Sequence, residues 1–227
     1  DMKREYPSIP AEAFAQSVEG AYYAQQFKKL YAEGRICKLP DNSHLPVCTA
    51  WDIGVGDSTA IWFFRLVGDQ IHIIDYYENS GEGLRHYMTV LKKKGYTYDK
   101  HYGPHDLNNK EFGSDAKSRA DIAREGYEID GAVYRLKFHV LPRGGIDGGI
   151  EQAREILPRC VFDEHKCAEG ISHLENYRKE WDDKRGCWKD RPLHDHTSHG
   201  ADAFRYLANS QTRRKISKNS NIRMAWA

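Results

Sequence analysis

The feature that most constrains the fold of this sequence is a succession of three apolar segments between residues 47 and 77. Val47–Ile53 is short and mainly apolar, Thr59–Val67 is rich in β-branched and aromatic residues, and Gln70–Tyr77 alternates with a two-residue period. Such segments are typical of strands. Because only Gly68 and Asp69 separate the second segment from the third, a tight turn is expected there. The sequence therefore predicts three strands, of which the last two form an antiparallel hairpin.

The rest of the chain alternates between helix and strand patterns. Helical spacing of apolar residues occurs over residues 10–34, 82–94, 116–125, 149–157, 164–177 and 198–209. Two more strands are expected at 98–102 and 137–141. We expect a loop over 35–46 and a protruding hairpin over 181–188. This order predicts an α/β fold, in which a mixed central β-sheet with an antiparallel hairpin is flanked by α-helices. The expected parts are an N-terminal helix and linker (1–46), the main domain (47–211) and a basic C-terminal tail (212–227).

Composition narrows the class of protein. The 227 residues, of which 40% are hydrophobic, are enough for one domain with a buried core. The net charge of +1 gives no overall sign of a nucleic-acid partner, so any attraction for phosphate must come from local patches. No apolar run reaches the roughly 20 residues that span a bilayer, so we expect no membrane partner. Five cysteines without a C-x-x-C pair favour a reducing compartment over a disulfide framework.

Three acidic residues stand out by their positions. Asp52 lies in an apolar strand, where a carboxylate is costly to bury unless a cation or hydrogen bonds compensate its charge. Asp106 follows a Gly-Pro break after a later predicted strand, and Asp202 lies early in the last predicted helix, beside its apolar face. If the strands at 47–53 and 98–102 are neighbours in the sheet, all three carboxylates can meet at one end of it.

Carboxylates that converge in this way repel each other, which raises their pKa values unless a divalent cation holds them together. Oxygen ligands of this kind favour Mg²⁺ or Mn²⁺ over zinc. Two such ions about 4 Å apart can activate a water molecule and stabilise the leaving oxygen of a phosphodiester. The alternative is a separate structural role for each residue, as a strand-end cap, a turn residue and a solvated helix residue. Taken together, the three contexts favour a metal-dependent nuclease.

The segments around these aspartates resemble the nuclease domain of the large terminase subunit of tailed bacteriophages. They are Trp51–Ala60, which contains a D-x-G, then Gly103–Asp106, and His194–Tyr206, which is the most specific of the three. The opening segment Glu5–Phe14 is also similar to the connection between the ATPase motor and the nuclease in that family. The likeness spans nearly the whole chain.

The resemblance implies a ribonuclease-H-like fold and an endonuclease that cuts double-stranded, concatemeric viral DNA during genome packaging, with little sequence preference. It implies two metal ions, with Asp52 bridging both and Asp106 and Asp202 each holding one. Because no G-x-x-x-x-G-K-[ST] phosphate loop is present, the chain would be the C-terminal portion without the ATPase. The partners it implies are double-stranded DNA, the N-terminal ATPase domain of the same subunit, the portal protein and the small terminase subunit, in the host bacterial cytoplasm.

Four further residues could border the metal site, as extra ligands or as hydrogen-bond partners of the ligands. Asp195 and His199 share a helical stripe with the third aspartate, although Asp195 could equally cap the helix. Asp57 lies in the loop after the first aspartate and could turn back toward the ions. His105, beside the second aspartate, could orient water or phosphate, or could be an ordinary turn residue.

Several basic residues are candidates for contact with DNA. They are Lys110, Lys117, Arg119, Arg143, Lys184 and Arg185. Each has a plain alternative as part of a solvated charged loop or hairpin tip. Glycines at 144–145 and 148–149 precede a predicted helix and resemble an anion-binding turn, although no complete nucleotide motif accompanies them.

Two other functions compete with the nuclease. An actin-like or sugar-kinase-like ATPase is one, because Asp52-Ile53-Gly54 followed by Ser58-Thr59 also resembles the first phosphate loop of that fold. Such a protein needs a second, similar half, and the sequence shows no sign of one. The other is a non-catalytic module that docks on a portal or on DNA. Metal-dependent nicking of supercoiled plasmid separates the nuclease from the docking module, and hydrolysis of ATP would instead support the rival enzyme.

Overall fold

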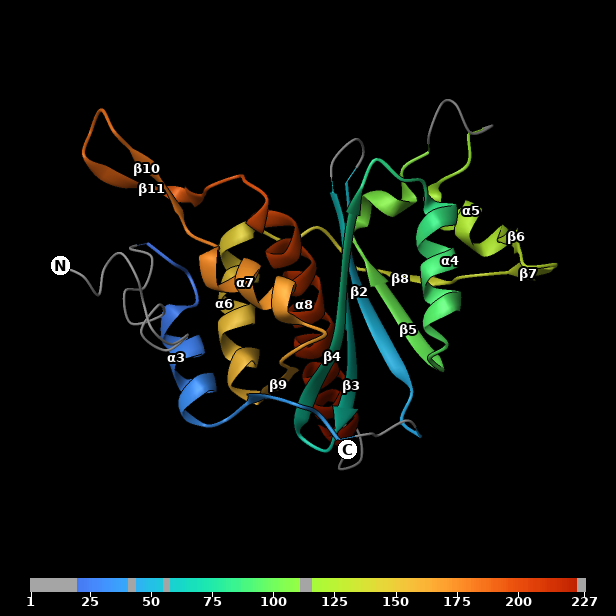
Figure 1. The fold of residues 1–227 in the computed structure, drawn as a ribbon, viewed down its shortest axis with the longest axis horizontal. Coiled ribbons are helices and arrows are strands. Elements are labelled where there is room, and N and C mark those ends of the chain that lie inside the picture. Colours follow the sequence, from blue (N-terminus) through green and yellow to red (C-terminus); the bar gives the residue numbers. More distant parts are fainter. Residues whose placement is uncertain (1–19, 41–43, 55–57, 111–115, 224–227) are drawn as a thin grey trace.

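The computed structural model describes residues 20–40, 44–54, 58–110 and 116–223, with residues 212–223 described by their backbone alone. Within these residues, seven strands form one sheet in the order β1-β9-β4-β3-β2-β5-β8, with helices on both of its faces (Figure 1). β3 is antiparallel to both of its neighbours, and the other neighbouring pairs are parallel. The predicted mixed α/β sheet with an antiparallel hairpin is therefore confirmed.

The sheet strands are β1 (Ile36–Cys37), β2 (Val47–Ile53), β3 (Ser58–Val67), β4 (Gln70–Ser80), β5 (Tyr98–Gly103), β8 (Phe138–Val140) and β9 (Cys160–Asp163). Two small hairpins stand apart from it, formed by β6 (Tyr127–Ile129) with β7 (Ala132–Tyr134) and by β10 (Lys179–Asp182) with β11 (Cys187–Pro192). The helices are α3 (Ala24–Ala32), α4 (Leu84–Lys94), α5 (Arg119–Glu125), α6 (Ile146–Ile156), α7 (Ala168–Asn176) and α8 (Thr197–Arg223), with short 3₁₀ turns η1 (His105–Asn108) and η2 (Leu157–Arg159).

The alternation of side chains along β2 divides the core into two parts. Ala50 belongs to the core cluster that contains residues of α3, α6, α7 and α8, whereas Trp51 belongs to the cluster on the opposite face with residues of α4 and α5. Successive side chains of a strand point to opposite faces. Asp52 therefore lies on the same face as Ala50, the face that α8 covers.

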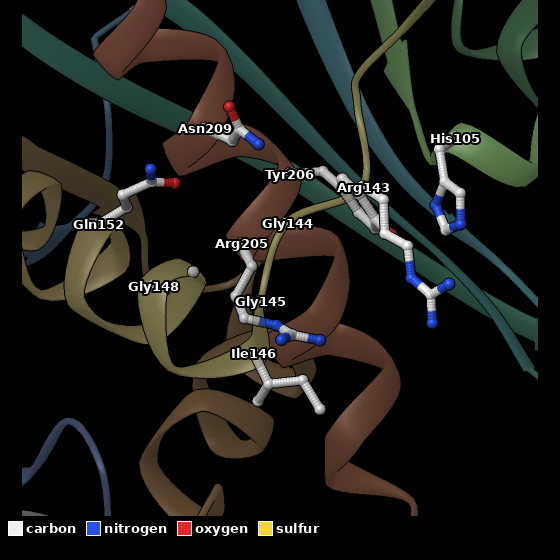
Figure 2. Close-up of a pocket in the computed structure, with 11 residues that line it drawn as sticks. His105, Arg143, Gly144, Gly145, Ile146, Gly148, Gln152, Arg205, Tyr206 and Asn209 are labelled. Carbon is white, nitrogen blue, oxygen red and sulfur yellow. The ribbon is translucent and has the colours of Figure 1, made fainter.

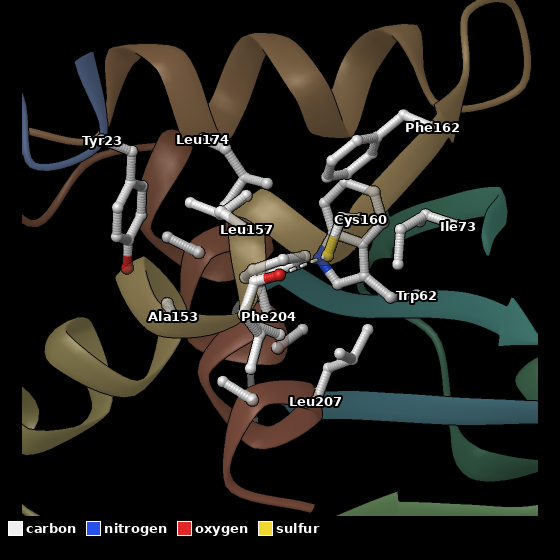
Figure 3. Packing of buried hydrophobic residues seen from close by; sticks show 14 of the residues in the cluster. Tyr23, Trp62, Ile73, Ala153, Leu157, Cys160, Phe162, Leu174, Phe204 and Leu207 are labelled. Atoms are coloured by element: carbon white, nitrogen blue, oxygen red, sulfur yellow. Dashed lines mark hydrogen bonds between the residues drawn. The ribbon is translucent and has the colours of Figure 1, made fainter. Parts of the chain in front are cut away.

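The larger cluster is built around Trp62, which is fully buried (Figure 3). Its ring lies 5.6 Å from that of Phe204 and 6.0 Å from that of Phe162, measured between centroids. The indole Nε1 donates a hydrogen bond of 2.8 Å to the carbonyl oxygen of Gly200. One residue of β3 thus fixes the first turns of α8, through ring packing against Phe204 and through the hydrogen bond to Gly200.

The N-terminal region differs from the prediction. Of the helix expected over residues 10–34, only residues from 20 onward are described, and there the helix begins at Ala24. Gly20 has φ +83° and lies against the Trp188 ring. The Tyr22 amide donates a hydrogen bond to the Tyr177 carbonyl. Residues 20–23 therefore contact other elements instead of continuing the helix. The loop expected over 35–46 contains β1, because Ile36–Cys37 pairs with β9, a strand that the sequence did not predict.

Other boundaries are set by local chemistry that the apolar pattern does not carry. α5 begins later than predicted because Ser118 and Asp121 form a capping box at its start. α6 begins earlier, at Ile146, and α7 later, at Ala168. The predicted hairpin at 181–188 is confirmed as part of β10 and β11, and it protrudes from the body of the molecule (Figure 1).

The C-terminal helix is longer than predicted. The pattern of apolar residues ends near residue 209, yet α8 runs to Arg223, through part of the segment for which a poorly patterned tail was expected. Among the helices of the described residues, none is long and apolar enough to cross a membrane.

Candidate active site

The parallel pairing of β2 with β5 brings the first two aspartates to one edge of the sheet. Thr49 pairs with His101 and Ala50 with Tyr102, so the two strands end together. Asp52 is the second-last residue of β2, and Asp106 lies in η1, directly after β5. The expectation that these strands are neighbours is confirmed.

Asp202 reaches the same edge because α8 packs across this face of the sheet. The helix lies against β2, β3 and β5. Its first turn approaches the sheet closely, since a Cβ atom on Gly200 would lie only 2.8 Å from the Tyr76 hydroxyl and 3.1 Å from His173. A small residue is therefore required just before Asp202. The glycine lets the start of the helix approach the sheet, and there His199 Nδ1 lies 3.9 Å from Asp52 Oδ2.

Tyr206 of α8 lies within the electrostatic influence of all three carboxylates. Burial raises the pKa of its hydroxyl to about 12, and Asp52 is the largest charged contribution in the same direction. Asp106 and Asp202 also raise this pKa, and the positive charge of Arg205 opposes them. Electrostatic influence of this kind weakens with distance. All three carboxylates thus lie close enough to one side chain to act on it together.

Asp202 is held by an ion pair within its own helix. Arg205 Nη2 lies 2.6 Å from Asp202 Oδ1, and the two side chains are 16% and 30% exposed. Burial raises the pKa of Asp202 to about 6, and the nearby charge of Asp52 adds to this rise. Arg205 and, to a smaller extent, His199 act in the opposite direction. Burial thus outweighs the ion pair.

Asp106 has a carboxylate oxygen without a partner. Its Oδ1 is buried and forms no hydrogen bond with any group that the structure describes. Buried acceptors in proteins are nearly always satisfied by a donor, a water molecule or an ion. An unpaired carboxylate oxygen at this edge is therefore suited to a cation. No group of three or more His, Cys, Asp or Glu side chains within the described part of the chain is arranged to hold a metal ion as it stands.

The other candidates from the His194–Tyr206 segment have different environments. His199 is buried, and its Nδ1 lies 3.9 Å from Asp52 Oδ2, so it borders the candidate site directly. Asp195 precedes α8, and its Oδ1 accepts hydrogen bonds from the Thr197 amide at 2.9 Å and from the Thr197 hydroxyl at 2.6 Å. These bonds lower the pKa of Asp195 although burial opposes them. This geometry matches the alternative in which Asp195 organises the start of the helix.

The two loop candidates are placed differently. His105 is exposed at the first position of η1, next to Asp106, and it lines a cavity together with Tyr206. Asp57 lies outside the described residues, as does the segment Glu5–Phe14.

The basic candidates fall into three groups. The first group lies near η1 and consists of Lys110, Lys117 and Arg119. Lys110 pairs with Ser118 in an isolated β-bridge. Lys117 forms an ion pair of 2.7 Å with Glu125. Arg143 lines the same cavity as His105. Lys184 and Arg185 lie in the turn of the β10–β11 hairpin, which protrudes from the body of the molecule (Figure 1).

Three residues lie at this edge although none of them was among the expected site residues. Tyr206 and Arg205 belong to the most specific motif, and their spacing from Asp202 on a helix could have indicated their proximity. Glu78 is in register with Asp52 through Ala60 of β3 and is held by His173, whose Nδ1 lies 3.2 Å from Glu78 Oε2. Its only signal was a polar residue near the end of an otherwise apolar strand.

Solved structures of large terminases share this fold. A large terminase from a thermophilic bacteriophage aligns with a TM-score of 0.57 and 18% identity, covering 84% of this chain and 45% of that longer protein. The P22 large terminase nuclease domain aligns at 0.51 and 16% identity, covering 79% of this chain and 89% of that domain. The large terminase nuclease of the thermophilic phage G20c with bound magnesium aligns at 0.51 and 14% identity, covering 86% of this chain and 98% of that one.

The chain therefore shares the mixed α/β fold of these proteins. In particular, it has the fold of large terminase nuclease domains, as the sequence resemblance implied. The chain spans less than half the length of the longer large terminase that it matches. No family model and no curated protein matches the sequence.

Proposed function

We propose that this chain is the nuclease portion of a large terminase, which cuts double-stranded concatemeric viral DNA during genome packaging in the cytoplasm of a bacterial host. The observation that carries the proposal is that β2, η1 and α8, the elements that carry Asp52, Asp106 and Asp202, lie at one edge of the sheet. The shared fold with the G20c nuclease, whose structure holds magnesium, supports it.

The three carboxylates would hold two Mg²⁺ or Mn²⁺ ions, with Asp52 shared between them. The buried, unpaired Oδ1 of Asp106 fits this role, and His199 beside Asp52 would serve as an additional ligand or as a hydrogen-bond partner. When bound, divalent ions supply positive charge that lowers the pKa of a water nucleophile and offsets negative charge on the phosphodiester.

The chain's own residues prepare this site. Because Arg205 Nη2 bonds to Asp202 Oδ1, the guanidinium competes with a cation for that oxygen. Tyr206 keeps its proton at neutral pH, since the pKa of its hydroxyl is about 12. It can therefore donate a hydrogen bond to a phosphate oxygen without adding another negative charge beside the three carboxylates.

The partners of the whole subunit follow from the same proposal. The longer large terminase, of which this chain covers under half, has been solved in complex with ATP-gamma-S. We infer an ATPase domain in the same subunit here. Its task would be to move DNA, while this portion cuts it. The portal protein and the small terminase subunit are proposed as partners on the family resemblance alone.

Digestion of supercoiled plasmid with the 227-residue chain tests the proposal. Cutting is expected with Mn²⁺ or Mg²⁺ and is expected to stop when a chelator is added. Asp52→Asn is expected to lower the rate by more than about 100-fold, because even residues that only support metal ligands contribute roughly 10- to 100-fold. Asp190→Asn is the matched control, because this aspartate is 94% exposed on the hairpin and should cut like the parent chain.

The outcome also separates the competing functions. Equal cutting by the Asp52→Asn variant and the parent chain would refute the role of the carboxylates. Absence of cutting together with metal-dependent hydrolysis of ATP would support the actin-like or sugar-kinase-like ATPase. Absence of both, with DNA still bound, would support a docking module.

A further inference from the structure

A cavity of about 280 Å³ opens beside the candidate active site (Figure 2). Three separate parts of the chain line it. His105 comes from η1, Arg143 and the glycine-rich turn precede α6, and Arg205 and Tyr206 come from α8. Two of these residues, Arg205 and Tyr206, also interact with the carboxylates, so the cavity and the site share a wall.

The position of Arg205 is fixed by the close approach of α6 to α8. A Cβ atom on Gly149 would lie 3.0 Å from Arg205 Cδ and 3.4 Å from its Cγ, so the α6 backbone packs directly on the arginine stem. The stem is thereby confined between the two helices. Its charged end lies between Asp202 on one side and the cavity on the other, and Figure 2 shows it among the lining residues.

The cavity contains more hydrogen-bond donors than the described residues satisfy. Arg205 Nη2 bonds to Asp202, but its Nε is buried without a partner. Arg143 is exposed and forms no ion pair within the part of the chain that the structure describes. Backbone amides in the first turn of α6 add to these donors, because no side chain caps the start of that helix. Two guanidinium groups and backbone amides together favour an anionic ligand.

We propose that this cavity binds a phosphate group of the DNA backbone, next to the bond that the carboxylates would cut. The planar guanidinium of arginine matches the geometry of a phosphate. Contacts to phosphate fix the position of a duplex and carry no sequence information. The cavity would therefore hold the DNA in register with the carboxylates whatever its sequence. This inference rests on the proposed nuclease function for the identity of its ligand.

A bound phosphate would also give Arg205 a second anionic partner. At present its guanidinium bonds to Asp202 Oδ1 at 2.6 Å. If the guanidinium also bonds to a phosphate, its ion pair with Asp202 Oδ1 becomes weaker. DNA in the cavity would thus favour the arrangement in which Asp202 is available to a cation.

The test measures DNA binding without catalysis. The anisotropy of a short fluorescent duplex is titrated with the 227-residue chain in chelator, over a series of salt concentrations. Arg143→Gln is expected to weaken binding roughly ten-fold, which is typical for the loss of one charge-assisted contact. It should also lower the slope of log affinity against log salt by about 0.9, the value for one phosphate contact.

Arg159→Gln is the matched control. Arg159 is half-buried, and its Nε donates a solvent-exposed hydrogen bond to the carbonyl of Asp69 in the β3–β4 turn, at the other end of the sheet. This variant loses the same charge and should bind DNA within about two-fold of the parent chain, because exposed charges farther away than a Debye length of about 10 Å are largely screened. An equal loss of affinity in both variants would overturn the proposal, since it would reflect net charge alone.

Two further arms complete the test. Inorganic phosphate and a mononucleotide are added as competitors. One outcome is that either competitor binds the parent chain tightly and Arg143→Gln weakly, while both chains bind the duplex with the same affinity. The cavity is then a small-anion site, and the proposal is overturned. Plasmid cutting is measured in parallel. Cutting by the parent with unchanged duplex affinity in Arg143→Gln overturns the cavity proposal alone. Arg143-dependent duplex binding without cutting supports the cavity and refutes the nuclease.

Discussion

Lowering the pH from 7 to 5 should destabilise this fold through His101, a buried residue of β5. The Trp51 indole donates to Thr49 Oγ1 at 2.6 Å, and Thr49 Oγ1 lies 2.8 Å from His101 Nδ1. With its oxygen accepting from Trp51, the threonine hydroxyl is placed to donate to a neutral imidazole. Burial lowers the pKa of His101 to about 4, with a smaller contribution from His139.

The size of the effect follows from this pKa. An unfolded histidine has a pKa of about 6.5, so protons bind the unfolded chain more readily than the folded one. The stabilisation is present in full above pH 6.5 and is lost as the pH falls through 4. The difference corresponds to about 3 kcal/mol in total. About 2 kcal/mol of it disappears between pH 7 and pH 5.

Urea unfolding at pH 7 and pH 5 measures this loss. The parent chain is compared with His101→Gln, which cannot bind the proton, and with His44→Gln, an exposed control. The free energy of unfolding of His101→Gln should fall less on acidification, by about 2 kcal/mol, than that of the parent and the control. Equal losses in the parent chain and His101→Gln would show that this buried ring does not carry the acid sensitivity.

Two other substitutions test how the site is positioned. Gly200→Ala would place a methyl group 2.8 Å from the Tyr76 hydroxyl. The free energy of unfolding in urea should therefore fall by about 1–3 kcal/mol, and plasmid cutting should fall clearly. Normal cutting by this variant would contradict the close approach. Ser118→Ala removes the capping box of α5 and should lower the free energy of unfolding by about 1 kcal/mol without changing the cutting rate per folded molecule. An unchanged urea midpoint would show that this cap contributes nothing.

Local pattern was enough to predict most of the architecture. The apolar alternation of Thr59–Val67 and Gln70–Tyr77, separated by two turn residues, predicted the β3–β4 hairpin, because such a hairpin depends on contacts close in sequence. The position of Asp52 inside an apolar strand marked it as unusual for the same local reason. The α/β class and the resemblance to terminase nucleases followed from these features and from the His194–Tyr206 segment.

Only the tertiary structure decided how these pieces meet. The pairing of β2 with β5 joins strands about fifty residues apart, and the stability of such a pair depends on the whole sheet rather than on either strand. The short strands β1 and β9 carry too few residues to show a period, so they exist only through their neighbours. The ion pair between Arg205 and Asp202, the role of Tyr206 and the cavity at Arg143 likewise depend on α8 packing closely against α6 and the sheet. The pattern of residues in the sequence does not indicate how closely these helices and the sheet approach one another.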